Sequence, residues 1–221
     1  MSATLLMREV DYSTVDVSQP YSAVSPTLDG EVLVTLVGTT RPLTGRQVAR
    51  LVRRGTQRGV LGALHRLVDQ GLVNAQDAGN AVLYTLNRDH LAYPAVEILA
   101  GIRSTFTNRL RETIVSWAVQ PIHVSVFGSA ARGDGDTASD IDLFVVRPDD
   151  VGEEDPAWRQ QLDELSASVR RWTGNQATIS EVSESAVGRL KRERPPVVDE
   201  LETDAILLVG TPVKDLQGER R

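Results

Sequence analysis

The 221 residues suffice for one large or two small domains, and a composition of 41% hydrophobic and 24% charged residues excludes collagenous, coiled-coil and wholly disordered proteins. The absence of cysteine excludes disulfide frameworks, thiolate zinc sites, iron–sulfur clusters and cysteine nucleophiles. The net charge of −6 excludes a chain that is basic throughout, and no apolar run is long enough for a membrane span or a secretory signal. We therefore expect a cytoplasmic protein with no membrane partner.

The first quarter of the chain predicts an arm followed by helices. Residues 1–26 lack periodicity and are expected to form an N-terminal arm. Apolar residues at 28–37 predict a helix that ends at Gly38 in a left-handed C-cap. Thr44 and Gln47 form a capping box at the start of a second helix.

The third predicted helix begins after Thr56, a plausible N-cap, and ends at Gly71. Residues 72–73 and 81–86 then predict two strands, joined by a polar connection at 74–80. Three helices followed by a β-hairpin resemble the winged helix-turn-helix domains of bacterial regulators. This domain is expected at residues 27–91.

The predicted helix-turn-helix carries a strong local charge, because residues 41–66 hold seven arginines and no acid. The resemblance implies DNA binding, with one group at the start of the third helix in the major groove and another on phosphates. The groove group is Thr56, Gln57 and Arg58, and the phosphate group is Arg46, Arg50, Arg53 and Arg54. A solvated helical face is the simpler alternative, and the predicted wing has no basic residue.

The remainder of the chain alternates strand and helix signals after a connecting helix at 92–120. This pattern predicts an α+β domain at 121–214, followed by a short tail at 215–221. Its predicted strands are 122–127, 141–146, 177–182 and 205–209, and its predicted helices are 129–132, 158–172 and 197–203.

A glycine-serine pair follows the first strand of this domain. Gly128 allows close approach of the backbone to phosphates, and the Ser129 hydroxyl can donate a hydrogen bond to them. Arg132 adds charge or braces the turn, and Ser139 begins the Ser-Asp-Ile-Asp-Leu run that follows. These four residues are the candidate nucleotide-binding residues.

Two aspartates lie at the start of the second predicted strand of this domain. Asp140 and Asp142 are separated by one residue, so their carboxylates point to one face, roughly 6 to 7 Å apart along the strand. Hard oxygen ligands of this kind suit Mg²⁺ or Mn²⁺, with substrate phosphates completing the shell. Two such ions bracket the oxygens of a phosphoryl or nucleotidyl displacement.

Together these residues read Gly-Ser, then Ala-Arg-Gly, five residues, and Ser-Asp-Ile-Asp-Leu. This pattern resembles the signature of minimal nucleotidyltransferases of the DNA polymerase beta superfamily. The resemblance implies a small mixed sheet flanked by helices, a nucleoside triphosphate held by Gly128 and Ser129, and catalytic metals held by Asp140 and Asp142.

The superfamily usually has a third carboxylate on a later strand, and this chain departs from that pattern. Strand alternation at 177–182 places Thr178 and Ser180 on one face and Glu181 on the other. Thr178 occupies the aligned position. Glu181 is the remaining candidate for a third catalytic carboxylate, provided that a bulge re-aims it.

The resemblance implies transfer of a nucleoside monophosphate to an acceptor hydroxyl, and the basic domain favours a macromolecular acceptor, either RNA or protein. The alternative is a DNA-binding regulator or antitoxin whose nucleotidyltransferase-like domain binds nucleotide or a toxin without turnover. Duplex DNA, a toxin partner and a second copy of the chain are the candidate partners.

Overall fold

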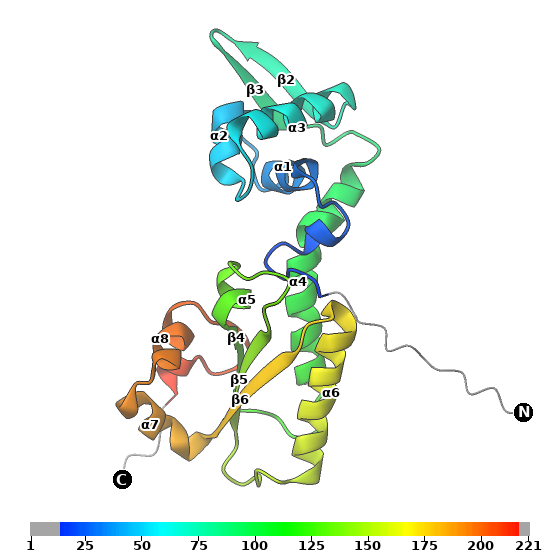
Figure 1. The fold of residues 1–221 in the computed structure, drawn as a ribbon. Helices are drawn as coiled ribbons and strands as arrows, with labels where there is room; N and C mark the ends of the chain where they lie inside the picture. The colour runs from blue at the N-terminus through cyan, green and yellow to red at the C-terminus, as the bar shows by residue number, and fades with distance from the viewer. Residues whose placement is uncertain (1–13, 217–221) are drawn as a thin grey trace, which may run out of the picture. The chain divides into compact units, whose positions relative to one another are not determined.

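The structure is a computed structural model that describes residues 14–216 (Figure 1). It divides into two compact units, which are described separately. Unit 1 comprises residues 110–216 with the described residues 14–18, and unit 2 comprises residues 19–109. The division falls inside one long helix, α4 (Tyr93–Val115), in the stretch where the sequence predicts a connecting helix.

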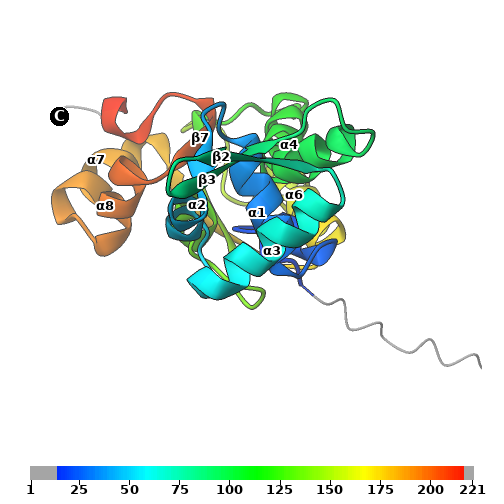
Figure 2. The same ribbon diagram turned by 90° about the horizontal axis from the view of Figure 1, so that it is seen from above.

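Unit 2 packs helices against a small antiparallel sheet with strand order β1-β3-β2 (Figure 2). Its core consists of buried apolar side chains from most of its helices and strands, among them Leu36, Val48, Leu64 and Tyr84. The elements are a short 3₁₀ helix η1 (Pro20–Ala23), α1 (Leu28–Val37), β1 (Leu43–Thr44), α2 (Gly45–Leu51), α3 (Gln57–Asp69), β2 (Val73–Ala78), β3 (Ala81–Leu86) and the first part of α4.

The helix starts of unit 2 follow the predicted capping chemistry. The Thr44 hydroxyl accepts from Gln47 N while the Gln47 side chain accepts from Thr44 N, which is the predicted capping box. Thr56 caps α3 by accepting from Gly59 N at 3.2 Å. These local contacts fix where α2 and α3 begin.

Three details of unit 2 differ from the sequence prediction. Gly38 has φ −68° rather than a left-handed conformation. Strand β2 continues to Ala78, so the hairpin turn is only Gly79 and Asn80, because pairing with β3 imposes an extended backbone on exposed polar residues. Strand β1 is two residues long and gives no periodic signal.

Unit 1 is an α+β unit around a mixed sheet, as predicted, and the strand order in this sheet is β6-β5-β4-β7. Strands β5 and β6 are parallel, and the other neighbours are antiparallel. Its elements are β4 (His123–Phe127), α5 (Gly128–Arg132), β5 (Ile141–Arg147), α6 (Pro156–Thr173), β6 (Ala177–Ser183), α7 (Glu184–Glu193), α8 (Pro196–Thr203), β7 (Ile206–Gly210) and the 3₁₀ helix η2 (Val213–Asp215).

The two faces of the sheet in unit 1 are covered differently (Figure 1). On one face, Phe127 and Phe144 pack with Val187 of α7 and Leu201 of α8. The other face meets α6, whose Trp158 is fully buried. Helix α7 is absent from the sequence prediction because Val187 and Leu190 are its only large apolar side chains, which is a short signal for a helix.

The end of the N-terminal arm that the structure describes is tied to unit 1. Val15 N donates to Thr173 O at 2.9 Å and to Asn175 Oδ1 at 3.2 Å, and Val17 is buried. This part of the arm is therefore ordered by contact with the end of α6. Across residues 14–216, none of the helices combines the length and apolar character that crossing a bilayer requires.

Candidate functional site

The candidate site lies at one end of the sheet of unit 1, where three elements meet. Asp142 is in register with Phe127 on the antiparallel neighbour and with Thr178 on the parallel neighbour. Because paired residues point to the same face of a sheet, Asp142 and Thr178 share one face. Gly128 follows Phe127 directly and begins α5.

Gly128 packs against the carboxylate of Asp142. Its φ is +66°, and a Cβ built on it would lie 2.5 Å from Asp142 Oδ2. Both the backbone conformation and the close approach of the carboxylate disfavour a side chain at this position. The glycine of the sequence motif is therefore explained by local packing. Without a side chain at residue 128, the Asp142 carboxylate can pack directly against the backbone at the start of α5.

The carboxylates at this end of the sheet repel one another. Burial raises the pKa of Asp142, the charges of Asp140 and Glu200 raise it further, and Arg132 lowers it in part. A divalent cation would relieve this repulsion and the cost of desolvation. The donor set of hard carboxylate oxygens fits Mg²⁺ or Mn²⁺.

The described residues, 14–216, contain no group of three or more His, Cys, Asp or Glu side chains arranged to hold a metal ion. The chain therefore offers the Asp140 and Asp142 carboxylates, and further ligands would have to come from water or a bound triphosphate. Mg²⁺ in nucleotide sites typically has one or two protein carboxylates and substrate phosphates, so the residues present fit this ion.

The raised pKa of Asp142 predicts opposite pH trends for metal binding and for stability. Between the ordinary carboxyl pKa and its raised value, the folded state binds more protons than the unfolded state, so metal-free stability falls as pH rises through this window. Metal binding needs the charged carboxylate, so Mn²⁺ affinity should fall as pH decreases through the same window. Mn²⁺ titration monitored by electron paramagnetic resonance tests this. An Asp142→Asn variant that kept the same pH dependence would contradict the assignment.

The structure brings two of the predicted hydroxyl residues together beside the loop between α5 and β5. A Cβ on Gly135 would lie 2.9 Å from Ser129 Oγ and 3.2 Å from Ser139 Oγ, so both hydroxyls face this glycine. Ser139 Oγ accepts from Asp136 N and donates to Asp136 Oδ1, both at 3.0 Å. Ser139 therefore shapes the loop between α5 and β5, while Ser129 lies next to Gly128 at the start of α5.

Arg132 points to carboxylates and links α5 to α8. Its Nε donates to Asp134 Oδ2 at 3.1 Å, and its Nη1 lies 3.3 Å from Glu200 Oε2 and 4.0 Å from Asp204 Oδ2. Hydrogen bonding to Asp134, followed by contacts with Glu200, raises the pKa of Arg132. Sequence reasoning missed Glu200 and Asp204, since no local pattern connects α8 to residues some 70 positions earlier in the chain.

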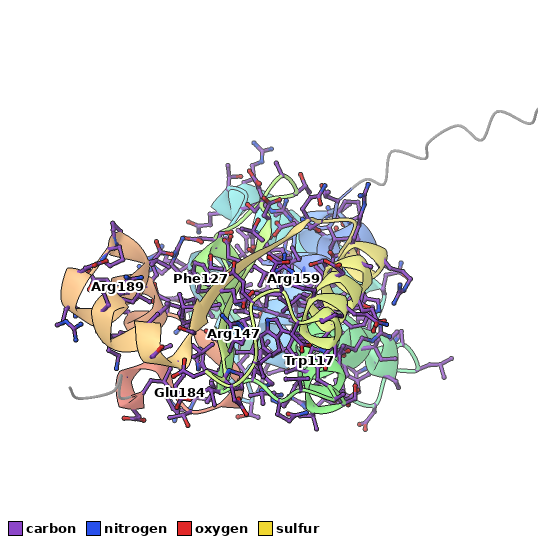
Figure 3. All side chains as sticks on the ribbon, turned by 90° about the horizontal axis from the view of Figure 1, so that it is seen from below. Trp117, Phe127, Arg147, Arg159, Glu184 and Arg189 are labelled. Carbon is purple, nitrogen blue, oxygen red and sulfur yellow. The ribbon has the colours of Figure 1, made fainter. Side chains whose placement is uncertain are left out.

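Glu181 is not brought to the aspartate pair. It is in register with Val145, on the opposite face of the sheet from Asp142, and its side chain is 13% exposed. Its Oε1 accepts from Arg147 Nε at 2.7 Å and from Trp158 Nε1 at 3.0 Å, and Arg159 Nη1 lies 3.5 Å from Oε2. Figure 3 labels both arginines, Arg147 at the end of β5 and Arg159 on α6. No bulge redirects the strand, so Glu181 links the sheet to α6.

The carboxylates instead have a hydroxyl neighbour on β6. Thr178 Oγ1 lies 3.4 Å from Asp140 Oδ2, and Thr178 is exposed. The preceding loop is positioned by Asn175, whose Nδ2 donates to Ser139 O at 2.9 Å. The alternation of β6 thus places Thr178 with the aspartates, as the sequence predicts.

Two of the candidate nucleic-acid residues of unit 2 line a shallow concavity of about 410 Å³. Arg46 of α2 and Gln57 of α3 line it together with Asn80 and Val82 of the hairpin, and Figure 2 shows these helices beside β2 and β3. The other predicted residues that are exposed are Arg50, Arg53, Arg54, Thr56 and Arg58.

The turn between α2 and α3 is held by a buried carboxylate that sequence reasoning missed. Glu31 of α1 is 4% exposed, and its Oε1 accepts from the backbone N–H groups of Arg53 and Arg54. Its Oε2 lies 3.8 Å from Arg54 Nε. Two of the predicted phosphate-binding arginines, Arg53 and Arg54, therefore lie on a turn whose backbone is held by the buried Glu31 carboxylate.

Comparison with known proteins gives a family match for one part of the chain. Residues 109–201 match the family model of the nucleotidyltransferase domain. The match covers less than half of the chain and includes Gly128, Ser129, Asp140 and Asp142. The nucleotidyltransferase domain predicted from the sequence is thereby confirmed, and no curated protein matches the chain.

Solved structures resemble the chain only remotely. A mutant of the toxin–antitoxin MntA-HpeT is 16% identical, with 49% of this chain and 77% of that chain covered and a TM-score of 0.34. A candidate nucleotidyltransferase from Sulfolobus solfataricus is 19% identical, with 47% and 76% covered and a TM-score of 0.28. Human N-acetylserotonin methyltransferase is 21% identical, with 47% and 32% covered and the same TM-score. Likeness at this level supports no argument about function.

Proposed function

We propose that the nucleotidyltransferase domain transfers a nucleoside monophosphate from a nucleoside triphosphate to an acceptor hydroxyl, with Mg²⁺ or Mn²⁺. The observation that carries this proposal is the contact between Gly128 and Asp142. It joins the glycine-serine turn to the carboxylate pair, so a triphosphate on the turn would have its phosphates beside both aspartates.

Each residue has a distinct role in this proposal. Gly128 and Ser129 hold the triphosphate, with the backbone close to the phosphates and the Ser129 hydroxyl as a donor. Asp140 and Asp142 would hold the metal ion, which when bound would supply positive charge to the transferring phosphoryl group and the departing pyrophosphate. Arg132 and Ser139 brace the two ends of the loop between α5 and β5.

Pyrophosphate release tests this reaction without knowledge of the acceptor. The full chain is incubated with each of ATP, CTP, GTP and UTP in Mg²⁺ or Mn²⁺, with and without a cell extract as the source of acceptors. We expect release with at least one nucleotide, and none when the metal is removed by chelation. Nucleotide binding without release in any mixture would refute the proposed transfer.

We propose further that unit 2 is a winged helix-turn-helix that binds DNA. Unit 2 holds ten arginines against six acids, although the whole chain carries a net charge of −6. The concavity lined by Arg46, Gln57 and Asn80 combines an exposed cation with amide groups able to reach base edges. These features favour a polyanionic partner on the face formed by α2, α3 and the hairpin.

Substitution of an arginine on this face should weaken DNA binding in a salt-dependent way. Arg46→Gln and Arg50→Gln, which alter two residues of the predicted phosphate group, should each make the negative slope of log K against log salt shallower by about 0.9, and lower the affinity roughly five- to tenfold at 0.1 M salt. Fluorescence anisotropy with a random-sequence duplex measures both quantities. Arg88→Gln, which alters an exposed arginine elsewhere in unit 2, is the control. An unchanged slope in both variants would remove these residues from the interface.

A second candidate function is a DNA-binding regulator or antitoxin that binds nucleotide or a toxin partner without efficient turnover. The observation that favours it is the hydroxyl of Thr178 beside Asp140, where a third carboxylate would strengthen the metal site. In this case Arg58→Ala would abolish the cellular function and Asp140→Ala would leave it intact. The reverse ranking would favour the enzyme, with RNA or protein as the acceptor.

A further inference from the structure

Strand β6 presents a hydroxyl to the carboxylate pair and no carboxylate of its own. Thr178 is in register with Asp142, its Oγ1 lies 3.4 Å from Asp140 Oδ2, and it is exposed. Glu181 lies on the other face, where its carboxylate accepts hydrogen bonds from Arg147 and Trp158. The group of β6 nearest to the expected position of the nucleotide is therefore an alcohol.

An alcohol beside a carboxylate is the pairing from which hydroxyl nucleophiles are built, because the carboxylate accepts the proton as the oxygen attacks. The contact of 3.4 Å is long for a hydrogen bond, and catalytic contacts are often long before substrate binds. The arrangement thus supplies an acceptor hydroxyl within the domain that is proposed to transfer nucleotides to hydroxyls.

We infer that Thr178 is itself an acceptor, so that the domain nucleotidylates its own β6. This inference rests on the proposed function. The Thr178 Oγ1–Pα bond forms as the bond between Pα and the bridging oxygen to the β-phosphate breaks, and pyrophosphate leaves. The hydroxyl proton passes to Asp140 Oδ2 and from there to water. The product is a threonine carrying one nucleoside monophosphate.

Other hydroxyls of the site are less suited to this step. Ser139 Oγ is engaged twice by Asp136. Ser129 belongs to the turn proposed to hold the triphosphate. Ser180 lies two residues farther along β6 than Thr178, in register with Phe144 of the hydrophobic core. Thr178 alone among these four hydroxyls contacts a carboxylate of the pair in the structure.

The modification would also block further nucleotidyl transfer at the same site. A nucleotide attached to Thr178 would occupy the space beside Asp140 and Asp142, because the modified oxygen is in contact with Asp140. The modified protein should therefore bind free nucleotide more weakly than the unmodified protein. This links self-modification to the regulation of the same site.

Intact-mass spectrometry and peptide mapping of the full chain after incubation with each triphosphate and Mn²⁺ test the inference. We expect one nucleoside monophosphate on the peptide that contains Thr178. Thr178→Ser should keep the adduct, since it keeps the hydroxyl, and Thr178→Val should lose it, since it keeps the shape alone. Thr211→Val is the matched control, because Thr211 is an exposed threonine at the opposite end of β4 and should leave labelling unchanged.

The outcomes separate this inference from the proposed function. Transfer to an extract component with no adduct on Thr178 would overturn self-modification and leave the proposed function standing. An adduct that persists in Thr178→Val would also overturn it. Absence of both adduct and pyrophosphate release, with nucleotide binding intact, would overturn both.

Discussion

Replacing Asp142 with asparagine is expected to lower nucleotidyl transfer by about 10³-fold, because a metal ligand contributes several kcal/mol of charge stabilisation to the transition state. The same variant should be more stable than the wild type in the absence of metal at neutral pH. Asp142 is partly buried, and both burial and the charges of Asp140 and Glu200 raise its pKa. Removing its charge therefore removes an unfavourable charge from the folded state.

Steady-state pyrophosphate release and thermal unfolding, measured with and without Mg²⁺, check these two effects together. Asp163→Asn is the matched control, since Asp163 is an exposed aspartate of α6. Its transfer rate and its melting temperature should stay close to those of the wild type. An Asp142→Asn variant with normal transfer, or one that loses both transfer and stability, would contradict the assigned role.

Replacing Glu181 with glutamine is expected to lower the free energy of unfolding by about 3 kcal/mol, since removing one member of a buried ion pair leaves the other charge uncompensated. The side chains of Glu181 and Arg147 are 13% and 11% exposed, and their closest atoms are 2.7 Å apart. Trp158 Nε1 also donates to Glu181. Nucleotide affinity of the folded variant should be unchanged, because Glu181 lies on the face of the sheet opposite to the aspartates.

Urea unfolding measures the loss of stability, and titration with a fluorescent nucleotide measures the affinity. Glu164→Gln, at an exposed position of α6, should change stability by no more than about 0.5 kcal/mol. Combining Glu181→Gln with Arg147→Met should restore part of the stability, since the unpaired cation is removed. Loss of transfer with unchanged stability in Glu181→Gln would instead make Glu181 a catalytic carboxylate.

Features set by short-range chemistry were predictable from the sequence. The capping box at Thr44 and Gln47 depends on residues three positions apart, and the structure forms it. The assignment of Thr178 and Glu181 to opposite faces depends only on the alternation of a strand, which β6 follows without a bulge. The order of strands and helices in unit 1 was predictable for the same reason, apart from α7.

Features set by long-range packing were not predictable. The exposed residues of β2, 74–78, are extended because β3 pairs with them, although their own types favour a loop. Glu31 reaches the turn at Arg53 from 22 residues away, and Glu200 reaches Arg132 from 68 residues away. No spacing in the sequence indicates either contact. The motif residues of the candidate site could thus be predicted from the sequence. The carboxylates that surround Arg132 could be found only from the folded structure.

The position of the transferred label tests the central claim most directly. The full chain is incubated with Mg²⁺, a cell extract and the same nucleoside triphosphate labelled in parallel at the α- or the γ-phosphate, and the label attached by the extract alone is subtracted. Nucleotidyl transfer predicts that α-label becomes covalently attached to a macromolecule, that γ-label appears only in pyrophosphate, and that Asp140→Asn abolishes both signals. Covalent attachment of the γ-label, or attachment of the α-label that persists in Asp140→Asn, would contradict the account.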